Sequence, residues 1–125
     1  MLAGSPVPVF GDGSSRRDYT YIADIVAGVR SALAYDRSMY EVINLGNNQT
    51  VQLIEMVHGL ERALGVEAQI ARLPEQPGDV PQTWARIDRA AELLGYAPRT
   101  PFAEGLAHFA RWVRQPHETA AAAAP

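Results

Sequence analysis

The sequence of 125 residues contains no cysteine and no lysine. Without cysteine there can be no disulfide, no thiolate metal site and no cysteine nucleophile. All eleven basic residues are arginine, so this chain alone supplies no lysine for a Schiff base, a phosphate-binding loop or a catalytic tyrosine. No apolar run reaches the length of a membrane span, and the N-terminus does not read as a signal peptide. We therefore expect no membrane partner and a cytoplasmic location.

The charge balance excludes another class of partner. The formal net charge is −3 at pH 7, and no basic stripe with interleaved aromatic residues is present. We therefore expect no nucleic-acid binding, and any anion must be bound locally. The length suits one compact domain with a modest core. We expect a single domain over residues 1–114 and a disordered tail over residues 115–125.

Four segments have the composition of extended structure. Each combines β-branched or aromatic residues with a glycine or proline boundary, or alternates along its length. The expected pieces are Pro6–Gly13, Asp18–Tyr21, Tyr40–Asn47 and Glu67–Pro74.

Three other segments have apolar residues at helical spacing, and a fourth is bounded by helix start and stop signals. Gly65 and Gly95 stand where helices commonly end, Asp88 and Thr100 are expected N-caps, and Pro101 is expected as the first helical residue. The expected helices run from Ile22 to Leu33, Gln52 to Leu64, Asp88 to Leu94 and Thr100 to Arg114, the last burying Phe102, Leu106, Phe109 and Val113. The alternation of strands and helices predicts an α/β fold with some parallel pairing.

Two adjacent arginines, Arg16 and Arg17, stand between an expected strand and an expected helix. A guanidinium group presents a planar set of donors that matches two phosphate oxygens at once. The pair could therefore bind a diphosphate. Alternatively, it belongs to a solvated turn and pairs with Asp12, Asp18 or Asp24.

The loop from Leu73 to Pro81 is rich in proline and glycine and follows an expected strand, where α/β proteins often place ligand contacts. Asp79 could accept hydrogen bonds from ribose hydroxyls, and Gln76 could donate to a carbonyl or a phosphate. The alternative is a rigid connector in which Asp79 bonds its own backbone. The Gly11–Gly13 turn lacks the third glycine of a dinucleotide-binding fingerprint.

Three stretches occur in an order that resembles a known family. They are PVPVFGDGSSRRDYTYIADIVAGV, YEVINLGNNQTVQLIEMV and LPEQPGDVPQTWARIDRAAELLGYAPRTPFAEGLAHFARWV. Together they resemble the C-terminal part of the NAD-dependent nucleotide-sugar epimerases and dehydratases, within the extended short-chain dehydrogenase/reductase family. The QPGDVP, NLGNNQ and LGYAPRTPFAEGL stretches most resemble the UDP-glucuronate 4-epimerases. The resemblance implies a partial α/β fold, the substrate-binding lobe without its Rossmann cofactor-binding half.

The same resemblance implies a set of substrate-binding residues. Val9 and Phe10 would lie along the nucleotide base. Arg17, rather than its neighbour, would bind the diphosphate of a UDP-sugar. Asp79 would lie near the ribose, and Gln76 stands where many relatives have a second phosphate-binding arginine.

The resemblance also shows what this chain lacks. The family holds NAD with a glycine-rich loop and uses a Tyr-x-x-x-Lys pair, and neither occurs here. We expect no cofactor to be bound by this chain alone, no catalysis without an N-terminal NAD-binding half, and a UDP-sugar as ligand. The alternative is a non-catalytic standalone binding or interaction module derived from the family. Faces that would pack on the missing half would be exposed, which predicts a homo-oligomer.

Overall fold

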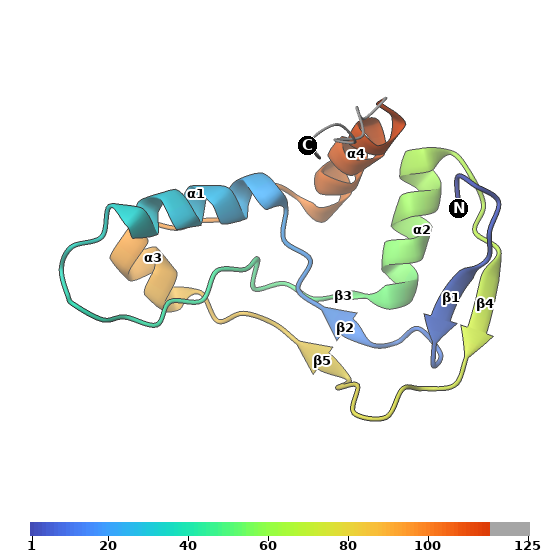
Figure 1. Cartoon of the computed structure of the whole chain (residues 1–125), viewed down its shortest axis with the longest axis horizontal. Helices are drawn as coiled ribbons and strands as arrows, with labels where there is room; N and C mark the ends of the chain where they lie inside the picture. Colours follow the sequence, from blue (N-terminus) through green and yellow to red (C-terminus); the bar gives the residue numbers. More distant parts are fainter. Residues whose placement is uncertain (116–125) are drawn as a thin grey trace, which may run out of the picture.

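The computed structural model describes residues 1–115, which form two lobes joined by a small sheet (Figure 1). The larger lobe contains strands β1 and β4 and helices α2 and α4, and the smaller lobe contains helices α1 and α3. Strands β2, β3 and β5 lie between them. The disordered tail predicted for residues 115–125 lies, apart from Gln115, outside the described residues.

The strands form two sheets, and both contain parallel pairs, as the alternating pattern predicts. In the larger lobe β1 (Val7–Phe10) runs parallel to β4 (Ile70–Leu73). In the connecting sheet β2 (Arg16–Arg17) is central, antiparallel to β3 (Val51–Gln52) and parallel to β5 (Gln82–Thr83). The extended piece predicted at residues 18–21 is therefore wrong in position, because the strand that pairs with β3 and β5 is Arg16–Arg17, which begins two residues earlier.

The four predicted helices are present, and they pack in two pairs. They are α1 (Ile22–Leu33), α2 (Leu53–Leu64), α3 (Asp88–Leu94) and α4 (Phe102–Arg114). Helix α2 packs on α4, and α1 packs on α3. Local signals explain the limits of α2: Gln52 and Glu55 form a capping box at its start, and Gly65 ends it at φ 62°.

The predicted starts of α3 and α4 are each wrong by one residue. Asp88 is the first residue of its helix rather than the cap, which is Ile87. Pro101 takes the cap position of α4 rather than Thr100. The backbone N–H of Thr100 instead donates to Asp24 Oδ2 at 3.0 Å, which fixes the entry of this helix against α1.

The strand predicted for residues 40–47 is not formed. A strand needs a hydrogen-bonded neighbour, and residues 1–115 place none beside this segment. Side chains bind its C-terminal end instead. The Asn47 N–H donates to Asp18 Oδ1 at 2.9 Å, and the Tyr96 hydroxyl donates to the Gly46 carbonyl at 2.9 Å.

The buried core is small for a chain of this length. Its hydrophobic residues, shared between the two lobes, are Val9, Val57, Leu64, Ala90, Tyr96, Leu106 and Ala110. In the predicted buried stripe of α4, Leu106 is buried but Phe109 is 43% exposed, so that part of the prediction is wrong. Many large apolar side chains, especially along α1, face solvent.

Candidate nucleotide-binding site

The centre of the candidate site is an ion pair between Arg17 and Asp79. Arg17 ends strand β2, and Asp79 lies in the loop that leads from β4 to β5, the parallel neighbour of β2. Arg17 Nη2 donates to Asp79 Oδ1, and Arg17 Nη1 donates to the Arg16 carbonyl at 2.8 Å. The two side chains are 28% and 50% exposed. The fold thus brings together Arg17, the residue predicted to bind phosphate, and Asp79, the residue predicted to lie near the ribose. The two residues are 62 positions apart in the sequence.

The neighbouring Arg16 has a different environment. Its Nε donates to Thr50 Oγ1 at 2.9 Å, and its Nη2 donates to the Thr50 carbonyl at 2.9 Å. These bonds connect β2 to the residue that precedes β3. Arg16 therefore supports the connecting sheet, and Arg17 is the arginine that reaches the loop.

Arg17 lines a cavity of about 520 Å³ between the ends of β2 and β5 and the segment before β3. Aromatic, polar and backbone groups share its wall, which consists of Arg17, Asp18, Tyr19, Thr20, Asn44, Leu45, Gly46, Thr83, Trp84 and Ala85. The lining thus includes a partly exposed guanidinium and the indole of Trp84, which is 57% exposed. A cation beside an aromatic surface can bind a phosphate group attached to a planar base.

Of the predicted site residues only Arg17 lines this cavity; Asp79 contacts it through the ion pair with Arg17, and the others lie outside it. Val9 is completely buried in β1, so its side chain belongs to the core and only its backbone could approach a base. Phe10 in the same strand is 37% exposed. Gln76 is exposed, and its carbonyl accepts a hydrogen bond from the Asp79 N–H at 3.1 Å, the local turn bond expected for a connector.

Sequence reasoning missed the part that Asp18 plays in the cavity wall. Its carboxylate accepts hydrogen bonds from Thr20 Oγ1 and from the backbone N–H groups of Asn47, Asn48 and Ala85, at 2.9 to 3.1 Å. These donors belong to three separate segments that border the cavity. No pattern in the sequence connects them, because Asn47 and Ala85 lie 29 and 67 residues from Asp18.

Tyr96, which is 5% exposed, supports the segment that contains Gly46, one of the residues that line the cavity. Burial raises the pKa of its phenol above the ordinary value of 10.0. The charges of Asp24 and Asp18 raise that pKa further, while the hydrogen bond to Gly46 opposes the shift. The hydroxyl therefore stays protonated and donates to the Gly46 carbonyl.

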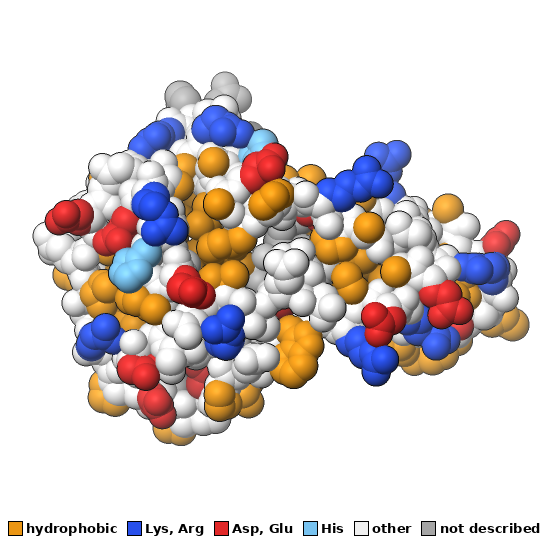
Figure 2. All heavy atoms as spheres, turned by 180° about the vertical axis from the view of Figure 1, so that it is seen from behind, with side chains coloured by type: hydrophobic (Ala, Val, Ile, Leu, Met, Phe, Trp, Pro, Cys, Tyr) orange, Lys and Arg blue, Asp and Glu red, His pale blue; other side chains and the backbone are white. Residues whose placement is uncertain are grey.

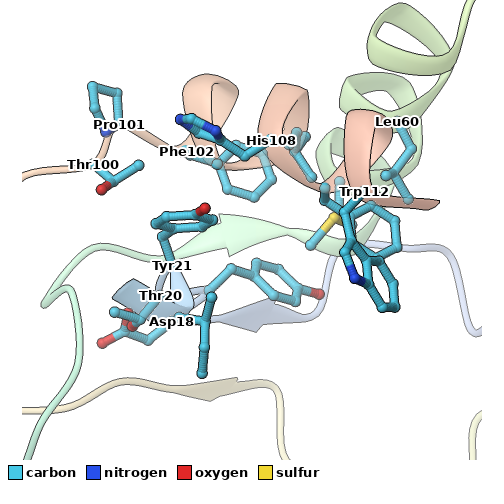
Figure 3. Close-up of a pocket in the computed structure, with 15 residues that line it drawn as sticks. Asp18, Thr20, Tyr21, Leu60, Thr100, Pro101, Phe102, His108 and Trp112 are labelled. Atoms are coloured by element: carbon cyan, nitrogen blue, oxygen red, sulfur yellow. The ribbon is translucent and has the colours of Figure 1, made fainter. Parts of the chain in front are cut away.

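A second, larger cavity of about 850 Å³ opens between α2, α4 and residues 18–22, and apolar and aromatic side chains line most of it (Figure 3). Tyr21 stacks on His108 with their ring centroids 5.1 Å apart. His108 Nε2 lies 3.5 Å from Glu104 Oε1, one turn away on the same helix. No group of three potential metal ligands occurs within residues 1–115, and the other ring nitrogen, His108 Nδ1, lies 2.6 Å from Arg111 Nη2.

Neither the Gly11–Gly13 turn nor the start of α2 forms a dinucleotide cradle. A dinucleotide cradle needs a glycine-rich turn that opens a helix, whose first N–H groups face the pyrophosphate. Here the Gly11–Gly13 turn leads into strand β2, and the start of α2 is occupied by its own Gln52 and Glu55 caps. Within residues 1–115, no helix is both long and apolar enough to cross a membrane.

The fold and its counterparts define a class: an α/β chain that corresponds to the substrate-binding part of extended short-chain dehydrogenases/reductases. A structure of MoeE5 with UDP-glucuronic acid and NAD matches with a TM-score of 0.86 and 32% identity, over 90% of this chain and 38% of that one. UDP-glucuronic acid 4-epimerase of Bacillus cereus with UDP-glucuronic acid and NAD matches with a TM-score of 0.80 and 34% identity, over 90% and 37%. The predicted fold class is thus confirmed.

The sequence profile of the GDP-mannose 4,6 dehydratase family matches residues 1–109, and the chain belongs to that family. UDP-glucuronate 4-epimerase of Thermodesulfobacterium geofontis is 36% identical over 88% of this chain and 34% of its own length. A probable UDP-glucuronate 4-epimerase of Rhizobium meliloti is 32% identical over 94% of this chain and 40% of its own length. The chain thus spans between about a third and two fifths of the length of these relatives, which confirms the resemblance to part of an epimerase.

Proposed function

We propose that this chain is the UDP-sugar-binding part of an NAD-dependent epimerase and that Arg17 binds the diphosphate of the ligand. The observation that supports this most is the convergence of Arg17 and Asp79 beside the cavity of about 520 Å³. Solved relatives whose names include UDP-glucuronic acid have the same fold over most of this chain.

The proposed binding chemistry follows from the hydrogen bonds that the Arg17 guanidinium already makes. Nη1 is held by the Arg16 carbonyl, which fixes the plane of the group, and Nη2 is held by Asp79. A diphosphate would take the place of the Asp79 carboxylate at Nη2 and gain charge-assisted hydrogen bonds. Asp79, once displaced, would accept hydrogen bonds from the ribose hydroxyls. Phe10 and Gln76 remain the proposed contacts to the base and to the remainder of the ligand.

The proposed role is binding without catalysis by this chain alone. Hydride transfer in these enzymes needs NAD, and residues 1–115 do not form a cradle for it. We expect no conversion of UDP-glucuronate when the purified chain is mixed with this substrate and NAD. Conversion above the rate of a boiled control would contradict this part of the proposal.

Isothermal calorimetry with UDP tests the site. Removing a charged hydrogen-bond donor should weaken binding by about tenfold to a hundredfold, so Arg17→Ala should lose most of the heat signal. Arg30→Ala is the matched control, because Arg30 is an exposed arginine in the last turn of α1, away from the cavity wall. Equal UDP affinity in the parent chain and Arg17→Ala would refute the proposed site, as would an equal loss in both variants.

A further inference from the structure

We propose that the larger cavity, between α2, α4 and residues 18–22, binds a small uncharged aromatic molecule that carries a carbonyl oxygen. Size, lining and two free hydroxyl groups define the chemical class of this ligand. The cavity shares residues 18–20 with the smaller cavity beside Arg17, but its ligand differs from a nucleotide sugar in charge. The inference goes beyond the proposed function and does not depend on it.

The size of the cavity suits a small molecule. Its volume is about 850 Å³, and cavities of about 300–1,000 Å³ hold ligands of drug size. Figure 2 shows hydrophobic side chains gathered in the hollow of the larger lobe. In Figure 3, Leu60 and Trp112 lie at one end of the cavity, and Thr20 and Thr100 lie at the other. The cavity can therefore hold a ligand with an apolar body and a polar end.

Aromatic rings make up much of the wall. Tyr19 and Phe102 have ring centroids 5.9 Å apart, and Phe109 and Trp112 have ring centroids 5.8 Å apart. Phe109 is 43% exposed and Trp112 is 55% exposed, so the second pair also offers ring surface to a ligand. Tilted and offset contacts with such rings favour a planar aromatic partner.

The charges at the cavity disfavour an ionised ligand. Among the described residues that line it, Asp18 has the only carboxylate, and none is an arginine. The Asp18 carboxylate already accepts hydrogen bonds from Thr20 and from three backbone N–H groups. The His108 ring lies between Glu104 and Arg111, with one nitrogen near each. An anion would find no free cation and a cation no free carboxylate, so an uncharged ligand fits best.

Two phenol hydroxyls supply the polar contacts. Tyr19 and Tyr21 line the cavity, and within residues 1–115 neither hydroxyl has a hydrogen-bond partner. Burial raises the pKa of the Tyr19 phenol above its ordinary value of 10.0, and the charge of Arg17 opposes this shift only in part. The hydroxyl therefore stays protonated at neutral pH and can donate. A carbonyl oxygen has two lone pairs and can accept a hydrogen bond from either phenol.

Two compounds with the same ring system test the class of ligand. Acetylnaphthalene is uncharged and has a carbonyl oxygen, and naphthoate, substituted at the same ring position, is an anion of similar size. Calorimetry should give a dissociation constant on the order of 0.1 mM for acetylnaphthalene and at least tenfold weaker binding of naphthoate.

Fluorescence locates the bound compound. The sequence contains two tryptophans, and Trp112 lines the larger cavity whereas Trp84 lines the smaller one. In Trp84→Phe the remaining indole therefore reports on the larger cavity, and acetylnaphthalene should quench it in a saturable way. In Trp112→Phe the remaining indole should show no saturable quenching.

A variant that fills the cavity tests its position. Gly105 lies in α4 and lines the cavity, and the atoms nearest to an added Cβ there belong to Tyr21, at 3.5 to 3.8 Å. Gly105→Phe should therefore place a ring in the cavity and weaken acetylnaphthalene binding at least tenfold. Ala103→Phe is the matched control, because Ala103 is exposed on the same helix and does not line the cavity, and it should leave the affinity unchanged. Circular dichroism confirms that each variant remains folded.

Removal of the two hydroxyls tests the polar contacts. Tyr19→Phe combined with Tyr21→Phe should weaken acetylnaphthalene binding roughly twofold to tenfold, because a neutral hydrogen bond contributes about this much. The same double variant should bind ethylnaphthalene, which lacks the oxygen, as tightly as the parent chain does. An equal loss for both compounds would show that the hydroxyls do not contact the ligand.

Several results would overturn the proposal. These are the absence of saturable Trp112 quenching by acetylnaphthalene, equal affinity for naphthoate, and unchanged affinity in Gly105→Phe. Light scattering that shows a dimer disrupted by Gly105→Phe would assign the cavity to a second copy of this chain instead. The UDP site is tested separately through Arg17, so either proposal can fail while the other holds.

Discussion

Asp18→Asn should destabilise the chain strongly, although it changes only one carboxylate oxygen to an amide nitrogen. The carboxylate accepts from the N–H groups of Asn47, Asn48 and Ala85 and from the hydroxyl of Thr20. An amide offers one acceptor oxygen, and its NH₂ group would face N–H groups. The donors of Asn47 and Ala85 are partly buried, so water does not fully replace the lost acceptor.

The expected loss follows from these bonds. A hydrogen bond to a charged group contributes about 1.5–3 kcal/mol, and a stranded, partly buried donor costs about 1–3 kcal/mol. Asp18→Asn should therefore lower the free energy of unfolding by roughly 2–4 kcal/mol, a large share of the total of about 5–15 kcal/mol typical of native proteins.

Urea unfolding followed by circular dichroism measures this loss. Asp36→Asn is the control, because Asp36 is exposed in the loop after α1, and its effect should stay within about 0.5 kcal/mol. If Asp18→Asn changed the free energy of unfolding by less than about 0.5 kcal/mol at an unchanged m-value, the role assigned to this carboxylate would be refuted.

Two further predictions concern Tyr96 and Asp79. Burial raises the pKa of the folded-state Tyr96 phenol, so its contribution to stability is fully present below pH 10.0 and is lost as the pH rises through the folded-state pKa. Tyr96→Phe should lower the free energy of unfolding at pH 7 by about 1–3 kcal/mol. In urea titrations at a series of pH values, the variant should also lose less of its free energy of unfolding above pH 10 than the parent chain. An equal loss in both proteins would contradict this. Asp79→Asn should raise the affinity for inorganic pyrophosphate about twofold to fivefold by calorimetry, because the carboxylate competes for Arg17. Glu75→Gln is its control, and an affinity that fell or stayed constant in Asp79→Asn would show that the ion pair does not compete.

The helices were predictable because their signals are local. Apolar spacing located α1 and α2, and Gly65 marked the end of α2 correctly. The same spacing could not show which side of α1 meets the body. An amphipathic helix predicts a partner for its apolar face, but the sequence does not say whether that partner lies in the same chain.

The strand predicted for residues 40–47 was wrong for a related reason. Its alternation is typical of a strand, but pairing depends on a neighbour at a distance along the chain, and the described residues provide none. The prediction assumed that a neighbouring strand would be present. The failure of the prediction and the unpaired backbone of this segment therefore have the same cause, which is that the described residues place no strand beside it.

The sequence named candidate residues for the site but could not show how they are connected. Arg17 and Asp79 were candidates from their chemistry and from the family resemblance, and the structure pairs them. Val9 stays a predicted base contact, and the burial of its side chain, which follows from the parallel pairing of β1 with β4, leaves its backbone for that contact. The contacts of Asp18 depend on three loops meeting, which a single sequence does not reveal.

The bonds that fix residues 46–48 also impose an order on folding. The acceptor at position 18 and the carbonyl at position 46 find their last donors 67 and 50 residues later, at Ala85 and Tyr96. During synthesis, residues 46–48 therefore cannot complete these bonds until Ala85 and Tyr96 have left the ribosome. Contacts of such long sequence separation slow folding, and nascent chains that stop before residue 96 leave this region without its anchor.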